Sequence, residues 1–211
     1  MILYGASGHA KVIIDTLEAI GMKIDYVVDD NAAISSLLGY EVRRDCGHYD
    51  RAIVSIGDGR IRKAIVNRLE VKEWVTAIHP KAAVSPRASI GEGSVVMAGT
   101  VINSGASIGK HCIVNTGATV DHDCVIGDFC HIAPGVHISG GTRIGEGSWI
   151  GVGACVKQGV SIGKWVTIGA GSVVVKDIPD NVTAFGCPCR VKETNQSDDM
   201  SKNQNQASRG G

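Results

Sequence analysis

The chain is poor in several features that would assign a protein to a class at once. Aromatic residues make up only 4% of its 211 residues, and 21 basic residues balance 21 acidic ones. No apolar run approaches the roughly 18 to 20 residues of a membrane-spanning helix. A balanced charge also gives no long-range field that would attract nucleic acid or an anionic membrane surface. We therefore expect a soluble, globular protein with neither of these as a partner.

Cysteine is present, but without the spacings of a metal ribbon or a redox motif. The seven cysteines are an odd number and include no CxxC pair. Cys187 and Cys189 are separated by one residue with no histidine nearby, which disfavours a zinc site. The start of the chain, MILYGASGHAK, lacks the charged and apolar regions of a secretory signal. These features favour a reduced, cytoplasmic compartment.

Glycine, by contrast, is abundant, with 28 residues, and it accompanies a repeat of six residues. From Ile78 to Val174 every sixth residue is Ile or Val, and the residue two places earlier is usually small. A period of six fits neither a helix nor the plain alternation of one strand, but it fits short β-segments joined by bends. Cys112, Cys124 and Cys130 occupy the small positions, so we expect them in the core.

A second period of 18 residues lies on top of the first. It is marked by a column of glycines, Gly91, Gly109, Gly127, Gly145 and Gly163. Three hexapeptides thus make one coil, and coils stacked roughly 4.8 Å apart give a triangular prism of parallel strands. The sequence predicts a parallel β-helix, whose handedness the period alone leaves open.

Residues 1–74 follow a different pattern, in which short apolar runs alternate with helical stretches. The runs MILY, KIDYVVDD and RAIVSIGDG are typical of strands, whereas AKVIIDTLEAIG and RIRKAIVNRLE are typical of helices. This alternation predicts a small, Rossmann-like parallel α/β sheet. We expect the β-helix domain to occupy residues 75–193 and a polar, mobile tail to occupy residues 194–211.

The first predicted strand leads into a glycine turn, Gly5-Ala6-Ser7-Gly8-His9, at the start of a helix. Backbone N–H groups in such a turn can approach a phosphate. Asp29 and Asp30 close the second strand, where folds of this type bind a ribose or a base. The alternative is a turn that needs only glycine geometry. A dinucleotide cofactor is disfavoured, because the third glycine of the GxGxxG fingerprint is absent.

The segment VDHDCV places a histidine between two carboxylates within the repeat. The position equivalent to His122 in the next coil is Gly140. Asp123 falls in a column that otherwise contains glycine. The column predicts a positive φ at Asp123. We expect His122 to point outward, with open space above Gly140, as a general base would require. The alternative is a solvated surface histidine.

Three motifs together resemble a known family. They are the Ile/Val hexapeptide repeat, the closing segment Gly186-Cys187-Pro188-Cys189-Arg190, and the His122-Asp123 pair followed nine residues later by His131. Across residues 1–193 the chain resembles the hexapeptide-repeat nucleotide-sugar N-acetyltransferases, in particular those acting on UDP-4-amino sugars, with the sialic acid O-acetyltransferases as relatives. The resemblance implies a left-handed β-helix, a homotrimer, and acetyl-CoA as co-substrate.

The same resemblance implies roles for individual residues. His122 and Asp123 would be catalytic. The acetyl-CoA groove would be lined by His131, Gly140, Val152 and Ala170. A nucleotide-linked amino sugar would be held by Ser7, Gly8, His9, Asp29, Asp30 and Gly57, and Asn115 would orient its amine.

The mechanism that we expect is direct attack of the sugar amine on the thioester carbonyl, without a covalent intermediate or a metal. His122 would remove the amine proton, Asp123 would stabilise the imidazolium, and a backbone N–H near Gly140 would stabilise the oxyanion. An O-acetyltransferase and a non-catalytic nucleotide-sugar scaffold remain alternatives. A zinc carbonic anhydrase is disfavoured, because the histidines of the repeat lack its five-residue ligand spacing.

A site shared between subunits follows from the expected positions of two histidines. We expect both His122 and His131 to face outward on different faces of one prism, so that a neighbouring prism completes the site. The same packing would cover the outward apolar residues Ile113 and Trp149.

Overall fold

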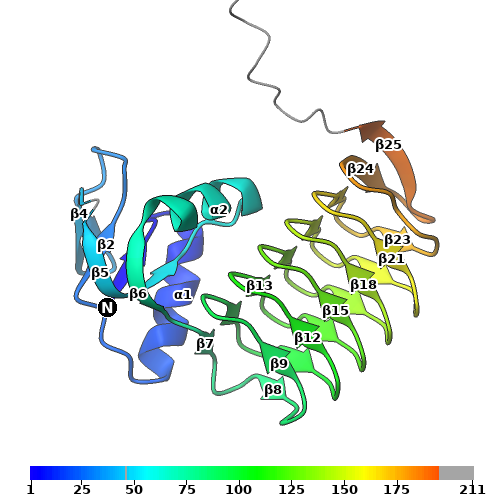
Figure 1. Cartoon of the computed structure of the whole chain (residues 1–211), viewed down its shortest axis with the longest axis horizontal. Coiled ribbons are helices and arrows are strands. Elements are labelled where there is room, and N and C mark those ends of the chain that lie inside the picture. Colours follow the sequence, from blue (N-terminus) through cyan, green and yellow to red (C-terminus); the bar gives the residue numbers. More distant parts are fainter. Residues whose placement is uncertain (46, 195–211) are drawn as a thin grey trace, which may run out of the picture.

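The computed structural model describes residues 1–45 and 47–194, which form a small α/β domain and a solenoid in series (Figure 1). Strand β6 (Glu70–Trp74) ends the first part, and β7 (Ala77–Ile78) begins the second. The boundary that we predict between residues 74 and 75 stays a prediction. Apart from Thr194, the predicted tail lies outside the described residues.

The α/β domain contains one sheet with the strand order β3-β4-β2-β1-β5-β6. Besides β6, its strands are β1 (Ile2–Tyr4), β2 (Tyr26–Val28), β3 (Ser36–Leu37), β4 (Tyr40–Arg43) and β5 (His48–Val54). All pairings are parallel except that of β3 with β4. The predicted small parallel sheet is therefore confirmed.

Two helices cover opposite faces of this sheet. Helix α1 (Gly8–Ala19) buries Ile13, Ile14 and Leu17 against one face, and α2 (Gly59–Arg68) buries Ile65 against the other. The apolar residues of each helix recur every three or four positions, which gives each helix one buried stripe. Both helices start directly after the carboxyl end of a strand, where ligands bind in open α/β sheets.

The solenoid is a left-handed β-helix made of three sheets, whose strands are parallel except for the antiparallel pairing of the last strand, β25 (Arg190–Thr194), with β24 (Val182–Phe185). The first sheet contains β7, β10 (Val95–Val96), β13 (Ile113–Val114), β16 (His131–Ile132), β19 (Trp149–Ile150) and β22 (Thr167–Ile168), and is extended by β24 and β25. The second contains β8 (Ala83–Val84), β11 (Val101–Ile102), β14 (Thr119–Val120), β17 (His137–Ile138), β20 (Cys155–Val156) and β23 (Val173–Val174). The third contains β9 (Ser89–Ile90), β12 (Ser107–Ile108), β15 (Val125–Ile126), β18 (Arg143–Ile144) and β21 (Ser161–Ile162).

The register of the coils is the 18-residue period of the sequence. On the first sheet, for example, Ile113 pairs with His131 and His131 with Trp149. The Ile and Val residues of the hexapeptide repeat fill the interior from Val96 onward, together with the predicted small cysteines. The first repeat positions, such as Ile78, are only partly covered, because no coil lies beneath them.

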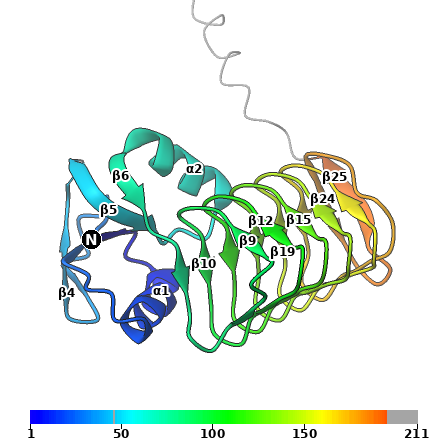
Figure 2. The same cartoon turned by 60° about the horizontal axis from the view of Figure 1, so that its bottom comes forward.

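The α/β domain packs on the first sheet of the solenoid, beside its first coils (Figures 1 and 2). Ile13, Ile14 and Leu17 of α1 share one core with Val95 and Ile113, and Ile113 is only 1% exposed. The prediction that a neighbouring prism covers Ile113 was wrong, because the chain's own α1 buries it. In the described part of the chain, neither helix has the length and apolarity to cross a membrane.

Candidate active site

His122 and Asp123 lie in the turn between β14 and β15, at the edge where the second and third sheets meet. Asp123 has a φ of 58°, as its place in a glycine column predicts. Its Oδ2 lies 2.9 Å from Nδ1 of His122. Asp121 fixes the same turn from the other side, since its Oδ1 accepts hydrogen bonds from the His122 N–H and from Nδ2 of Asn103.

The carboxylates around His122 favour its protonated form. Because a carboxylate can only accept, Nδ1 of His122 carries a hydrogen, and in the neutral ring Nε2 holds the lone pair. The hydrogen bond to Asp123 and the charge of Asp121 raise the pKa of His122 above its ordinary value. The side chain is 54% exposed, so Nε2 is accessible to a reacting group.

Gly140 lies beside the His122 ring, one coil further along the solenoid. A Cβ atom at position 140 would lie 2.5 Å from Nε2 of His122, so glycine is what leaves room for the imidazole. Gly141 donates its N–H to the His122 carbonyl. Among the described residues, no acceptor takes the Gly140 N–H, which leaves this donor free on the residue beside the His122 ring.

His131 belongs to a different cluster, on the first sheet, and it is buried. It is 7% exposed, because the loop between β5 and α2 covers it. The expectation that His131 faces outward toward a neighbouring subunit was therefore wrong: its side chain does leave the solenoid, but it points into the chain's own α/β domain. Trp149, one coil further on, stacks on the His131 ring at 5.1 Å and remains 41% exposed.

Each ring nitrogen of His131 has a partner. Nδ1 lies 3.1 Å from the Gly57 carbonyl, and Nε2 lies 3.2 Å from Nδ2 of Asn115. The ring of His9, at the start of α1, lies 5.7 Å away. Burial, then the charges of His9 and Arg62, lower the pKa of His131 to about 4. His131 is therefore neutral at physiological pH.

The glycine turn before α1 is held in place by Asp29. One oxygen of this carboxylate accepts the Ala6 N–H at 2.6 Å, and the other accepts the Asn31 N–H at 2.8 Å. Ser7 and Gly8 follow the turn at the start of α1, where both are exposed. Backbone N–H groups at such a helix start can donate hydrogen bonds to a bound anion.

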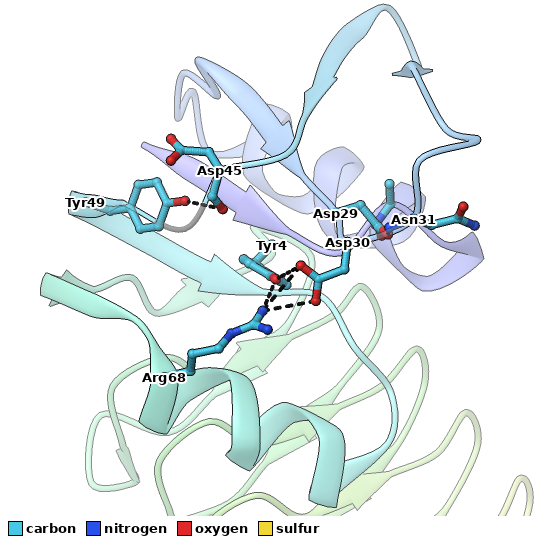
Figure 3. A network of polar contacts seen from close by, with 8 residues as sticks. Tyr4, Asp29, Asp30, Asn31, Asp45, Tyr49 and Arg68 are labelled. Atoms are coloured by element: carbon cyan, nitrogen blue, oxygen red, sulfur yellow. Dashed lines mark hydrogen bonds and ion pairs between the residues drawn. The ribbon is translucent and has the colours of Figure 1, made fainter.

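Asp30 has other partners, which come from the same sheet and from α2 (Figure 3). The Tyr4 hydroxyl donates to its Oδ1 at 2.7 Å, and Arg68 donates to its Oδ2 at 3.1 Å. Arg68 also donates to the Tyr4 hydroxyl. The bond from Tyr4, followed by Arg68, keeps the pKa of Asp30 below its ordinary value, so the carboxylate is ionised.

A cavity of about 210 Å³ adjoins His131 between α2 and the solenoid. Its wall is formed by Asp58, Gly59, Arg60, His131, Gly147, Trp149, Trp165 and Thr167. The Arg60 guanidinium lies over the Trp165 ring at 4.5 Å. The exposed residues Val152 and Ala170 lie one coil apart further along the solenoid, and Gly171 donates to the Val152 carbonyl.

The predicted residues thus fall into separate groups. Gly57, His9, Asn115 and His131 come together between the domains, whereas His122, Asp123 and Gly140 lie at another edge of the prism. Four residues of these groups were not predicted from the sequence: Tyr4, Arg60, Arg68 and Trp165. Trp165 carried a sequence signal, because its column alternates glycine with large rings: Gly93, His111, Phe129, Gly147 and Trp165. The structure gives Trp165 a φ of 55°. The residues that the structure describes include no group of three or more His, Cys, Asp or Glu placed to hold a metal ion.

Comparisons with known proteins agree with this division. Residues 1–69 match the family described as PglD N-terminal domain, and residues 105–140 and 141–176 match the bacterial transferase hexapeptide repeats. A variant of perosamine N-acetyltransferase from Caulobacter crescentus, solved with CoA and GDP-perosamine, is 41% identical with a TM-score of 0.84, covering 90% of this chain and 95% of that one. The acetyltransferase domain of PglB from Neisseria gonorrhoeae FA1090, solved with acetyl coenzyme A, is 41% identical with a TM-score of 0.82, covering 90% and 98%.

A short match comes from a curated sequence, the galactoside O-acetyltransferase of Lactococcus lactis, which is 70% identical over 30 residues. The chain spans only 14% of the length of that relative. The match therefore concerns a short segment and not the whole protein. Taken with the long structural matches, the chain belongs to the hexapeptide-repeat acyltransferases and, within them, to the group of nucleotide-sugar N-acetyltransferases.

Proposed function

We propose that this protein transfers an acetyl group from acetyl-CoA to the amine of a nucleotide-linked amino sugar, of the UDP-4-amino-sugar type. The observation that carries this proposal is the His122-Asp123 pair, in which Nδ1 is held by the carboxylate and Nε2 is exposed beside Gly140. Relatives solved with CoA, acetyl coenzyme A and GDP-perosamine support acetyl transfer to a nucleotide-linked amino sugar.

In the proposed reaction the sugar amine attacks the thioester carbonyl, and His122 takes the proton that the amine loses. Holding the two substrates side by side supplies much of the acceleration, and a positioned base adds typically 10²- to 10⁴-fold. The Asp123 carboxylate stabilises the imidazolium that forms. As the tetrahedral intermediate collapses, the C–S bond breaks and the CoA sulfur leaves with the proton that His122 gained.

The developing oxyanion needs a donor near the thioester. We assign this role to the backbone N–H of Gly140, which no acceptor among the described residues takes. Because Gly140 lies beside Nε2 of His122, the base and the oxyanion donor meet at one point. The remaining CoA would extend along the solenoid past Val152 and Ala170.

The nucleotide sugar would bind to the α/β domain. Its phosphates fit the exposed start of α1 at Ser7 and Gly8, and its ribose or base fits the strand end at Asp29 and Asp30. His9, Gly57, Asn115 and His131 would line the path from this site toward the solenoid. Asn115 acts through His131 in this arrangement, because its amide donates to Nε2 of that ring.

We further propose a homotrimer in which each site is built from two chains. His131 lies under its own α/β domain on the first sheet, whereas His122 lies at the edge between the other two sheets. A neighbouring chain could bring its His122 to the nucleotide sugar. The exposed Trp149 and Val152 are apolar surface that such a neighbour would cover. The homotrimer and a cytoplasmic location stay predictions.

The identity of the nucleotide and of the acceptor atom is open to a direct test. Purified protein is mixed with acetyl-CoA and UDP-, GDP- or CMP-linked amino sugars, and CoA thiol release is measured with His122→Ala as the control. We expect release with an amino sugar only, and most with UDP; the relative solved with GDP-perosamine makes GDP the second candidate. Release with a hydroxyl analogue instead would favour O-acetylation. Tight binding without release from any of them would make the protein a nucleotide-sugar scaffold.

A further inference from the structure

Arg62 of α2 is a charged side chain with no carboxylate partner among the described residues, and it is only 1% exposed. All of its hydrogen bonds go to backbone carbonyls. Nε donates to His111 at 2.8 Å, Nη1 to Ile56 at 2.7 Å and Gly57 at 2.9 Å, and Nη2 to Phe129 at 2.6 Å and Cys130 at 3.3 Å. Burying an unpaired charge is costly, so these carbonyl dipoles must compensate it.

The five carbonyls belong to both domains. Those of Ile56 and Gly57 lie in the loop between β5 and α2, and the other three lie on adjacent coils of the solenoid. His111 and Phe129 occupy one left-handed corner column, with φ of 52° and 58°. Among the described residues, no backbone N–H donates to their carbonyls, so the Arg62 guanidinium satisfies groups that the coil ladder leaves unused.

The close approach of α2 to this corner depends on Gly59. A Cβ atom there would lie 2.9 Å from the Phe129 carbonyl oxygen. Helix α2 therefore starts in direct contact with the solenoid backbone, and the Arg62 fork fits only in this docked position. The contact fixes the loop that carries Gly57.

The Gly57 carbonyl is shared between Arg62 and Nδ1 of His131. A carbonyl only accepts, so Nδ1 of the neutral His131 ring carries the hydrogen and Nε2 carries the lone pair. The Asn115 amide agrees with this assignment: its Oδ1 accepts the Thr116 N–H, which directs the Nδ2 donor toward His131. The charge of Arg62 also contributes to lowering the pKa of His131.

We propose that Arg62 is a positioning residue that, by holding the Gly57 carbonyl against His131, commits His131 to the Nδ1–H tautomer. Its Nε2 then accepts the Asn115 amide N–H and so fixes the Asn115 side chain, and it has no hydrogen to donate to a thioester oxygen. The tautomer follows from the contacts alone; its effect on substrate binding rests on the proposed function.

The tautomer is measured without any substrate, by ¹⁵N NMR of imidazole-labelled protein near neutral pH. The His131 signals are identified by their loss in His131→Gln. We expect the neutral Nδ1–H form in the wild-type protein. A wild-type ring with the hydrogen on Nε2 would overturn the proposal, whether or not the protein transfers acetyl groups.

The role of Arg62 is tested with Arg62→Lys. Lysine keeps the charge, but its donors are all on one nitrogen atom, which cannot reach the carbonyls of both domains at once. In the folded variant we expect a mixture of tautomers at His131. We also expect kcat/KM for the nucleotide sugar to fall roughly 10- to 100-fold, as for one or two buried groups left unpaired. The acidic limb of the pH profile of kcat/KM reports the ionisation of His122 and should not shift. The matched control is Arg43→Lys, an exposed arginine paired with Glu41.

A folded Arg62→Lys protein with wild-type tautomer and kinetics would overturn the proposal. Should that variant fail to fold, Gly59→Ala replaces it, because a methyl group facing the Phe129 carbonyl displaces α2 while keeping the guanidinium. The same tautomer mixture is expected, and an unchanged His131 ring in this variant would contradict the proposal. If no nucleotide sugar causes CoA release, the proposed function is wrong, but the measured tautomer of His131 is unaffected.

Discussion

Nδ1 of His122 and Oδ2 of Asp123 lie 2.9 Å apart although the two residues are adjacent in the chain. Neighbouring side chains of an extended strand point to opposite faces, so this contact requires a turn. The left-handed backbone at Asp123 supplies it, at a cost that glycine would not incur. In the proposed reaction this turn orients the exposed imidazole that acts as the base.

His122→Ala tests the base directly. We expect turnover to fall roughly 10²- to 10⁴-fold, because the variant lacks a group that takes the amine proton in the transition state. Acetyl-CoA affinity should change little, and is measured by calorimetry beside the steady-state rates. Near-normal turnover at neutral pH would remove His122 from the mechanism.

The pH profile of Asp123→Asn tests the acid of the pair. His122 acts as a base only when it is deprotonated, so kcat/KM should rise with pH through the pKa of His122, which Asp123 and Asp121 hold above its ordinary value. Loss of the Asp123 carboxylate lowers that pKa. The acidic limb should move to lower pH, while the plateau falls roughly 10-fold or more because the imidazolium is less stabilised. A limb that stays in place would show that Asp123 does not tune His122.

Gly140→Ala and Gly141→Ala form a contrasting pair of neighbours. A methyl group at position 140 meets Nε2 of His122 at 2.5 Å, so we expect activity to fall roughly 10-fold or more with little change in stability. Position 141 has a φ of 65° and nothing within 4 Å of its Cβ, so alanine there should cost about 1 kcal/mol of stability and leave turnover intact. Thermal unfolding and thiol release separate the two effects. If Gly141→Ala lost activity and Gly140→Ala lost only stability, the His122 ring would not lie beside Gly140.

The repeat was predictable because each coil buries its own Ile or Val and needs no distant partner. The corner geometry at Asp123 was predictable for the same reason, since its column otherwise contains glycine. The contacts between the two domains cannot be recognised from any comparable repeat in the sequence. Ile113 and His131 occupy outward positions of the repeat, and the packing of α1 and the β5–α2 loop, not the local sequence, decides that both are buried.

Arg62 shows the same limit more sharply. In the segment RIRKAIVNRLE it is one of several basic residues on a short helix, and this pattern is typical of a solvated face. Its burial depends on unused carbonyls at two corners of the solenoid, which come from residues 49 and 67 positions further along the chain. No local pattern reports such a partner, so only the structure distinguishes Arg62 from Arg60 and Arg68.

Asp29→Ala tests where the nucleotide sugar binds. The Asp29 carboxylate holds the Ala6 N–H and so keeps the turn before α1 in shape. We expect the KM for the nucleotide sugar to rise far more than the KM for acetyl-CoA, because the turn lies on the α/β domain and not on the solenoid. Steady-state kinetics with each substrate varied in turn measure both. The opposite ranking would show that the two substrates are assigned to the wrong domains.

Subunit mixing tests the shared site. Gly140 lies against His122 of the same chain, so lesions at these two positions disable the same half-site. The informative pair is His122→Ala and His131→Trp, because His131 lies on the first sheet with the α/β domain. If sites form between chains, an equal mixture of the two inactive proteins, unfolded and refolded together, should regain about a quarter of the wild-type activity. Each half is then intact with a probability of about one half. If each chain holds a whole site, the mixture stays inactive, and a fully active monomer would exclude the trimeric arrangement outright.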